Sequence, residues 1–259
     1  MNAIGLHAVG LLGPGLDDFD SARPILTGDA PLTSREVQVP PPGLLPANER
    51  RRTTATIRLA LKVAEEATRD ADRGQLRSVF ASSSGDMDII DRICDALTQS
   101  EPVVSPVQFH NSVHNAPAGN WSIATRNPAP ATALSGYNAS LAAGLLEAAT
   151  LQLAEGGDVL LACYDVPSME SFIHVRPIHH PFAVALRLGP VDEAPWRLEL
   201  DLGGPATADR CISADLEALR GSNPAARALP LLEQLVRGAP GNVTLAAPLG
   251  RSLNIRIEP

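Results

Sequence analysis

The feature that most constrains the fold is a run of small and apolar residues, PAPATALSGYNASLAAGLLEAATLQLAEGGDVLLACYD, which covers residues 128–165. It reads as a short strand, a sharp turn of small residues and a long Ala/Leu helix. A Gly-Gly stop and a buried strand follow. A β-turn-α-β order requires a crossover connection, so we expect parallel strands and a right-handed crossover. The sequence therefore predicts an α/β protein.

The remaining elements follow from apolar periodicity and turn residues. Strands are predicted at 3–12, 78–83, 181–188 and 196–202, and a closing hairpin-like pair at 242–248 and 252–258. Helices are predicted at 53–71 and 86–98, after Pro106 with a bend or new start at Pro117, and over 212–236 with a break at 221–224. Residues 40–46, PPPGLLP, are predicted to form an extended covering loop.

Composition narrows the function classes. The 259 residues are 44% hydrophobic and 19% charged, which supports a buried core and one domain over residues 1–259. A net charge of −8 and only 3% aromatic residues disfavour nucleic acid as a partner. No apolar run approaches the roughly 20 residues of a membrane span, and the first residues lack signal-peptide features. We therefore expect a cytoplasmic protein.

Cysteines and histidines give no sign of a metal or cofactor. Cys94, Cys163 and Cys211 are odd in number and widely spaced, which suits neither disulfides nor a CxxC site. Cys163 lies within the apolar strand LLACYD and is expected to be buried and inert. His110 and His114 are four residues apart, a possible metal spacing, but no HExxH glutamate or third ligand accompanies them. We expect no metal and no cofactor.

Two further groups of residues, three histidines and Ser135, could each be either catalytic or structural. His179 and His180 lie within PIHHPF, with His174 nearby, and a polar loop is favoured there over a catalytic site. Ser135 within LSGYN resembles a nucleophile elbow only loosely, because the GxSxG motif is absent. Neither group is therefore assigned a reaction.

Several landmarks in a fixed order resemble the β-ketoacyl synthases of the thiolase fold. They are GLLGPGLDDF, RRTTATIRLALKVAEEATRDA followed by VFASSSGD, VSPVQFHNSVHNAPAGNWSIA with Ser105, Pro106, Asn115, Ala118 and Gly119, and GGDVLLACYD. The resemblance covers residues 1–165, and LGRSLNIRIEP is similar to the family's last Gly-rich turn and strand. It implies a thiolase-like layered α/β fold in which 166–259 form an abbreviated C-terminal half.

The chain departs from this family at the nucleophile. Condensing enzymes carry a cysteine at the start of the helix after the small-residue turn, where the helix dipole and backbone amides favour a thiolate. Aligned without gaps from Pro130, that position falls on Asn138, and a shift of one residue gives Tyr137. Neither side chain can exchange an acyl group at neutral pH, so we predict that no catalytic nucleophile is present.

A second departure concerns the family's histidines and lysine. Ketosynthases hold two histidines and a lysine in their C-terminal half, where they promote decarboxylation of malonyl thioester and stabilise the enolate oxyanion. This chain has no histidine after Leu188, and Lys62 is its one lysine. The resemblance therefore implies a catalytically silent subunit of the chain-length-factor type, not an enzyme.

The resemblance also implies partners. Such a subunit pairs with a full-length, active ketosynthase as a heterodimer, receives substrates on an acyl carrier protein, and shapes the acyl tunnel in fatty-acid-like or aryl polyene biosynthesis. The apolar strand at 129–135 would be buried in the interface, and the segment 107–115 would lie near the partner's acyl tunnel. The tunnel and interface residues are expected to be Gln108, Phe109, Ser112, Pro130, Thr132, Leu134 and Ser135.

Two alternatives stay open at this point. The chain could be an acyltransferase or malonyl decarboxylase of the same fold that uses Asn138 as an oxyanion donor. Steady turnover of thioesters by the isolated chain would favour this. It could also be a homodimeric acyl-carrier or lipid-binding protein, which stable homodimers indifferent to any ketosynthase would support.

Overall fold

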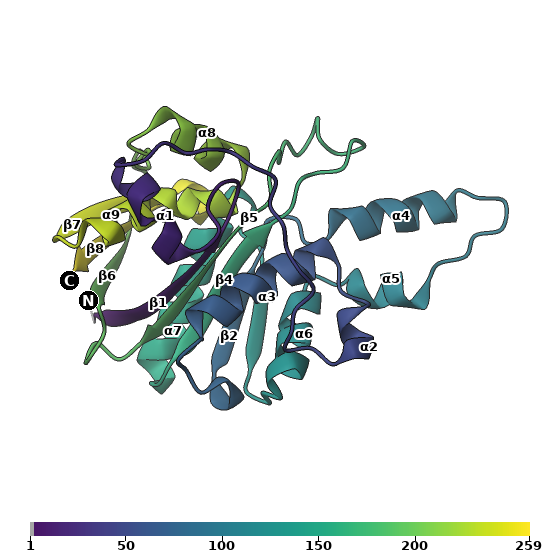
Figure 1. Ribbon diagram of the computed structural model, residues 1–259, viewed down its shortest axis with the longest axis horizontal. Helices are drawn as coiled ribbons and strands as arrows, with labels where there is room; N and C mark the ends of the chain where they lie inside the picture. Colours follow the sequence, from purple (N-terminus) through teal and green to yellow (C-terminus); the bar gives the residue numbers. More distant parts are fainter. Residues whose placement is uncertain (1–2) are drawn as a thin grey trace.

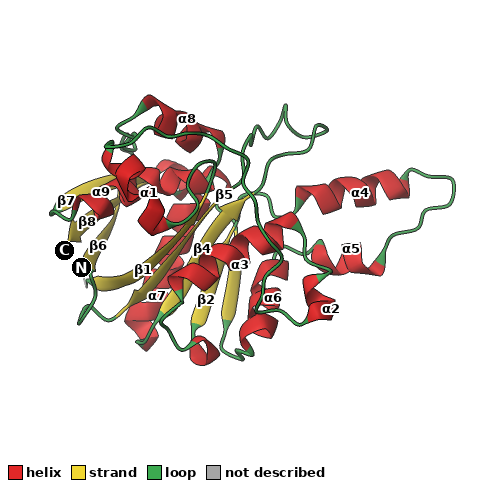
Figure 2. Cartoon of the chain, in the orientation of Figure 1, coloured by secondary structure: helices red, strands yellow, loops and turns green. Residues whose placement is uncertain are grey.

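The computed structural model describes residues 3–259, which form one eight-stranded mixed sheet with helices on both faces (Figures 1 and 2). The strands are β1 (Ile4–Leu12), β2 (Arg77–Ala81), β3 (Ala131–Leu134), β4 (Val159–Asp165), β5 (Phe182–Gly189), β6 (Trp196–Gly203), β7 (Gly241–Ala246) and β8 (Ser252–Glu258). Their order across the sheet is β3-β2-β4-β5-β1-β6-β8-β7. β3 and β7 are therefore the two edges.

The helices predicted from the sequence are present, and two further helices, α1 (Phe19–Thr27) and α2 (Ala47–Arg50), lie where the apolar periodicity predicted none. The others are α3 (Ala55–Ala67), α4 (Met87–Leu97), α5 (Pro106–Asn111), α6 (Ala116–Thr125), α7 (Ser140–Glu155), α8 (Ala214–Ser222) and α9 (Leu229–Arg237), with short 3₁₀ turns η1 (Arg73–Gln75), η2 (Tyr137–Ala139), η3 (Ala225–Ala228) and η4 (Pro248–Gly250). Thr54 and Asp86 cap α3 and α4 through their side chains. Residues 40–46 form a loop, as predicted.

The parallel part of the sheet confirms the β-turn-α-β prediction. β2 pairs in parallel with β3 on one side and with β4 on the other, and α7 connects β3 to β4. β5 then runs antiparallel to both β4 and β1. The closing strands β7 and β8 form the expected antiparallel pair, and β8 continues the sheet to β6.

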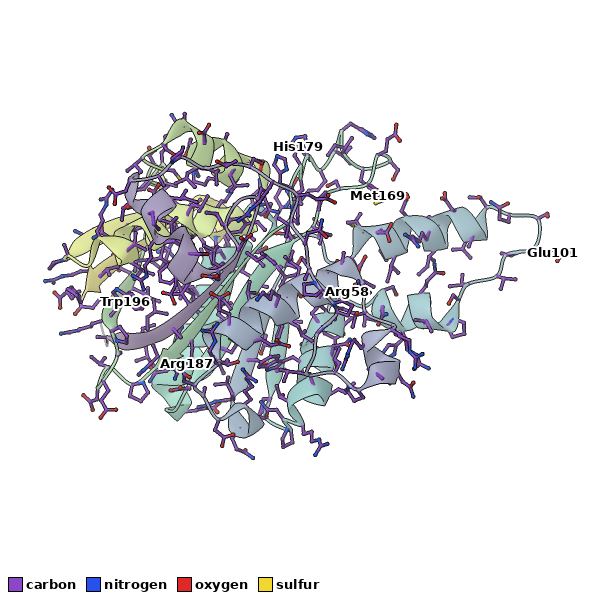
Figure 3. The ribbon with its side chains drawn as sticks, in the orientation of Figure 1. Arg58, Glu101, Met169, His179, Arg187 and Trp196 are labelled. Atoms are coloured by element: carbon purple, nitrogen blue, oxygen red, sulfur yellow. The ribbon has the colours of Figure 1, made fainter. Side chains whose placement is uncertain are left out.

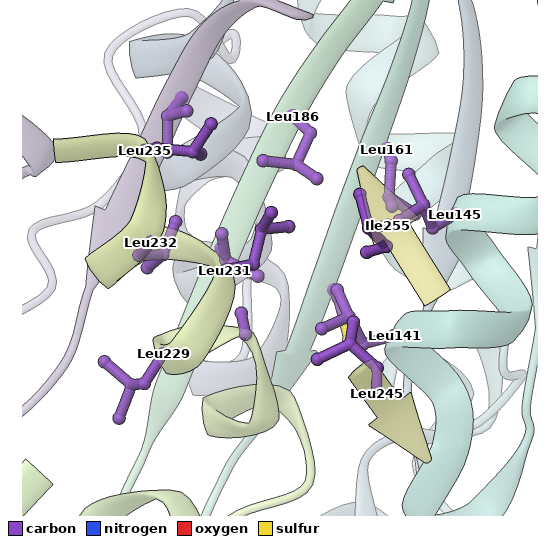
Figure 4. Close-up of a cluster of buried hydrophobic side chains, with 14 of the residues drawn as sticks. Leu141, Leu145, Leu161, Leu186, Leu229, Leu231, Leu232, Leu235, Leu245 and Ile255 are labelled. Atoms are coloured by element: carbon purple, nitrogen blue, oxygen red, sulfur yellow. The ribbon is translucent and has the colours of Figure 1, made fainter. Parts of the chain in front are cut away.

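Two apolar layers sandwich the sheet. α3 and α6 cover one face, with Phe80 and Tyr164, while α7, α9, α1 and α8 pack on the other. Every residue of β4 is buried, as expected of a central strand covered on both faces. α3 lies so close to β1 that a Cβ atom on Gly10 would stand 2.1 Å from the carbonyl oxygen of Val63. Leucines from α7, α9 and the sheet fill the second layer (Figure 4).

Pro117 starts a new helix, which is one of the two outcomes predicted for it. The segment after Pro106 does not continue through Pro117: α5 ends at Asn111, and Pro117 lies in the first turn of a separate helix, α6. α4 and α5 project together from the body of the molecule as an arm (Figure 1). None of the described helices is both long enough and apolar enough to cross a membrane.

Candidate functional site

The candidate site lies at the carboxyl ends of the parallel strands β2, β3 and β4, which is where α/β proteins commonly bind ligands. After β3 the chain turns sharply through η2 into α7, and Tyr137 has a φ of 53° in the left-handed region. Two hydrogen bonds hold this strained turn. The backbone N–H of Gly136 donates to Ser140 Oγ over 3.0 Å, and that hydroxyl donates to the Tyr137 carbonyl over 2.8 Å. Tyr137 and Asn138 are therefore fixed at the start of α7.

Arg176 covers this turn. Its Nη1 donates to Asn138 Oδ1 over 2.6 Å, and its Cζ lies 3.9 Å from the centre of the Tyr137 ring, a cation–π contact. Its Nε donates to Ser84 Oγ over 3.1 Å. Arg176 comes from the irregular segment 166–181 between β4 and β5, which carries Met169 and His179 in Figure 3. A guanidinium therefore rests on both residues that the sequence places at the nucleophile position.

Asp165 anchors the strand ends beneath Arg176. It is the last residue of β4 and is 1% exposed. Its Oδ1 accepts hydrogen bonds from Ser82 Oγ (2.9 Å), Ser83 N–H (2.9 Å) and Ser83 Oγ (2.7 Å). Burial raises the pKa of this carboxyl to about 6, against the lowering effect of these hydrogen bonds and of Arg176. The carboxyl ties β2 to β4 directly below the turn.

The raised pKa of Asp165 predicts a pH-dependent stability. Between its unfolded value near 3.8 and its folded pKa of about 6, the folded protein retains a proton that the unfolded chain has released. The free energy of unfolding should therefore fall by about 3 kcal/mol as the pH rises through this window, at about 1.4 kcal/mol per pKa unit. Urea titrations at pH 4, 5, 6 and 7 measure it. Asp165→Asn should remove this dependence of the free energy of unfolding on pH. The prediction is contradicted if the variant loses as much stability between pH 4 and pH 6 as the native chain does.

The predicted tunnel residues fall into two groups. Gln108 lines a cleft of about 660 Å³ between the start of α3, α4 and α5. Phe109, also on α5, is 68% exposed, and Ser112 Oγ donates to the Phe109 carbonyl over 2.8 Å. Pro130, Thr132, Leu134 and Ser135 instead belong to edge strand β3 and its ends. The structure places these groups on the arm and on the sheet edge.

The edge strand is more exposed than its apolar sequence suggests. Ala131 is exposed, and Thr132, Ala133 and Leu134 are half-buried. Ser135 is exposed, and its hydroxyl donates to the carbonyl of Ser83 over 3.2 Å. The reason is that β3 has a neighbour, β2, on one side only. Burial of this strand requires another chain.

The histidines and cysteines do not form a reactive group. His110 lies on α5, whereas His114 follows its end, so the two do not share a helix face; the His114 ring lies 3.1 Å from the Ser82 carbonyl through Nε2. His174, His179 and His180 lie on segment 166–181, the predicted loop. Within residues 3–259, no three His, Cys, Asp or Glu side chains gather as metal ligands. Cys163 is fully buried, and burial raises the pKa of its thiol well above the usual value.

Asp165 and Arg176 were missed by the sequence reasoning. The position of Asp165 at the end of the apolar run LLACYD is a signal that could have identified it as a site residue. A charged side chain in a buried strand needs hydrogen-bond donors around it. Arg176 carries no comparable signal: it lies in a segment without periodicity, and its contacts with Ser84 and Asn138 are 92 and 38 residues distant along the chain.

Solved structures share this fold at low sequence identity. A chain of the ketosynthase ApeO in complex with its chain length factor ApeC from Xenorhabdus doucetiae matches with a TM-score of 0.76 and 22% identity, covering 99% of this chain and 100% of that one. The ishigamide ketosynthase/chain length factor matches with a TM-score of 0.74 and 13% identity, covering 99% of each chain.

A third structure, AntDE:AntF, a type II PKS acyl-carrier protein in complex with its ketosynthase bound to the hexaketide, matches with a TM-score of 0.74 and 9% identity, covering 99% of each chain. These likenesses establish the thiolase-like α/β fold that the sequence motifs implied. No curated protein sequence matches the chain.

The family model "Beta-ketoacyl synthase, N-terminal domain" matches residues 28–244, which include the turn at Tyr137, the buried Asp165 and the arm. Since that match extends over most of the 259 residues, the chain belongs to the β-ketoacyl synthase family.

Proposed function

We propose that this chain is a catalytically silent, chain-length-factor-type subunit that pairs with an active β-ketoacyl-ACP synthase and shapes its acyl tunnel. The observation that carries the proposal is the contact of Arg176 with Asn138 and Tyr137 at the nucleophile position. An amide and a phenol under a guanidinium cannot accept an acyl chain as a thioester. The fully buried Cys163 cannot replace the missing thiol.

The free edge of β3 supports a heterodimer. The carbonyls of Pro130 and Leu134 accept hydrogen bonds from Ser78 and Ser82 next to β2. Since successive residues of a strand direct their backbone groups to opposite edges, Ala131 and Ala133 direct theirs away from β2. These outward groups can pair with a strand of a partner, and an uncovered edge of this kind promotes aggregation.

Exposed apolar side chains lie on the elements that flank β3 along the chain. Phe109 and Val113 on and after α5, Ile123 on α6 and Tyr137 at η2 are all between 47% and 68% exposed. α6, which follows α5, packs beside β3, and η2 comes directly after β3. Apolar side chains gathered around an unpaired strand are typical of a protein interface.

Two of the matched structures are ketosynthase and chain-length-factor pairs, and the third is an acyl-carrier protein in complex with its ketosynthase. This supports a ketosynthase as the partner and an acyl carrier protein as the source of substrate. Biosynthesis of a polyene of the aryl polyene type, or another fatty-acid-like product, is the pathway we propose. Co-expression with the ketosynthase encoded nearest to this chain tests the proposal: a stable complex that elongates acyl chains is expected, whereas the chain alone should be inactive.

The tunnel role predicts changes in product length. In the co-expressed pair, Phe109→Ala should lengthen the product, because each additional CH₂ that the tunnel can bury contributes about 0.8 kcal/mol. Gln108→Trp, Phe109→Trp or Ser112→Trp should shorten the product without stopping turnover. Mass spectrometry of the released acyl chains measures both. Val103→Trp, in the loop between α4 and α5 and 77% exposed, is a suitable control. If no variant alters product length, the subunit only stabilises its partner.

A further inference from the structure

Three arginines converge on the start of α7 from three separate segments. Arg220 on α8 and Arg227 on η3 line a small cavity together with Asn138. Arg176, from segment 166–181, reaches the same Asn138 through the 2.6 Å hydrogen bond, and its charge acts on Arg227. The segments are held together, because Asn223 Nδ2, between Arg220 and Arg227, donates to the carbonyls of Asp165 (3.0 Å) and His180 (2.7 Å). The cluster is thus part of the fixed framework.

Only one of the three guanidiniums is neutralised. Arg220 donates to both oxygens of Glu217, over 2.7 and 2.6 Å. Arg176 forms no ion pair within residues 3–259, and its Nη2 is buried without a hydrogen-bond partner. In the same part of the chain, the side chain of half-buried Arg227 makes neither an ion pair nor a hydrogen bond. Burial and the charges of Arg220 and Arg176 lower the pKa of Arg227.

The acidic groups near the cluster form no ion pair with Arg176 or Arg227 within residues 3–259. Asp165 Oδ1 accepts hydrogen bonds from Ser82 and Ser83, and its Oδ2 is buried without a hydrogen-bond partner. Asp209, which lines the cavity, accepts a hydrogen bond from the Thr244 N–H over 2.8 Å through Oδ2. Glu233 on α9 accepts from the N–H of Ile212, which precedes α8. Arg176 and Arg227 therefore have no ion-pair partner in their partly buried surroundings, since Asp165 acts on Arg176 only at longer range, and an anion that contacts both guanidiniums would stabilise them.

We propose that Arg176, Arg227 and Asn138 form a binding site for an oxyanion, the carboxylate or phosphate group of a small ligand, at the position where the family holds its nucleophile. The guanidinium fork suits both groups, since each presents two oxygens in a plane. The enclosed space among Asn138, Arg220 and Arg227 measures about 10 Å³, room for a single oxygen atom. Only one oxygen atom of the carboxylate or phosphate group therefore enters the cavity, and the rest of the group stays at the cavity entrance.

Binding of simple anions to the full chain tests this directly and needs no ketosynthase, so its outcome is separate from that of the proposed function. Thermal unfolding is followed in sodium phosphate, sodium malonate and sodium chloride at equal ionic strength. We expect phosphate or malonate to raise Tm well beyond chloride, in a saturable manner. A stronger effect of malonate identifies a carboxylate ligand, and a stronger effect of phosphate identifies a phosphate ester.

Substitutions locate the site. Arg227→Met keeps the apolar stem and removes the guanidinium, and it should weaken anion binding at least tenfold. Arg227→Lys, which retains the charge but not the fork, should give an intermediate affinity and guards against loss of folding. Arg69→Met, at an exposed arginine beyond α3, should bind as the native chain does. Anion effects no larger than those of chloride, or equal in Arg227→Met and Arg69→Met, would overturn the proposal.

Discussion

Ala133→Pro is expected to abolish the complex with the ketosynthase while the chain itself stays folded. The hydrogen bonds of Pro130 and Leu134 to β2 show that the N–H of Ala133 faces the free edge of β3. Proline at this position removes an N–H that the chain does not use, which edge strands tolerate. A partner strand, however, loses a donor and meets the pyrrolidine ring. Co-purification from the same cell should therefore fail.

Two neighbouring substitutions make the comparison specific. Ala133→Ser keeps the N–H and a small side chain, and it should leave the complex intact. Thr132→Pro removes the N–H on the opposite side, which faces β2, so it should lower the stability of the isolated chain as well. Circular dichroism and size-exclusion chromatography separate the two effects. A complex that survives Ala133→Pro would show that β3 does not pair with the partner, and a homodimer lost by the same variant would favour the homodimeric alternative.

The regular core could be read from the sequence because its signals are local. The turn of small residues, the Ala/Leu helix and the Gly-Gly stop at 156–157 predicted the parallel arrangement of β3 and β4 about β2. The break between α5 and α6 was harder to place, because Pro117 is compatible both with a bend and with a helix start. Tertiary contacts decide between the two: Asn111, at the end of α5, donates from Nδ2 to the Arg52 carbonyl over 2.9 Å.

Only part of the chemistry of the site could be predicted from the sequence. The absence of a thiol at Asn138 follows from the residue type and the turn, both of which are local. The arginines that contact Asn138 could not be predicted from local sequence. Arg176, Arg220 and Arg227 meet at Asn138 only because the sheet brings β4, α8 and η3 together, and contacts between such distant segments leave no periodic trace in a sequence. The same holds for Asp165, whose donors Ser82 and Ser83 precede it by more than 80 residues.

Asn138→Cys is expected to create a reactive thiol but no condensing enzyme. The new sulfur would stand near the present position of Asn138 Cγ, one bond from Oδ1, which now lies 2.6 Å from Arg176 Nη1. A guanidinium and the start of α7 both stabilise a thiolate, so the pKa of this thiol should be low. Iodoacetamide should alkylate it far faster than the buried Cys163, and incubation with an acyl thioester should give a covalent adduct detectable by mass spectrometry.

Carbon–carbon bond formation should nevertheless stay at least ~10³-fold below that of an active ketosynthase, because general acid–base groups and oxyanion donors supply factors of this size. The chain has no histidine after Leu188 to promote decarboxylation, and its C-terminal part places Arg220 and Arg227 at the site instead. Asn138→Ser, which offers a hydroxyl of similar size, is the matched control and should show neither alkylation nor acylation. A β-keto product from Asn138→Cys alone would mean that the arginines can replace the missing histidines, since no other cationic side chains reach Asn138 in residues 3–259.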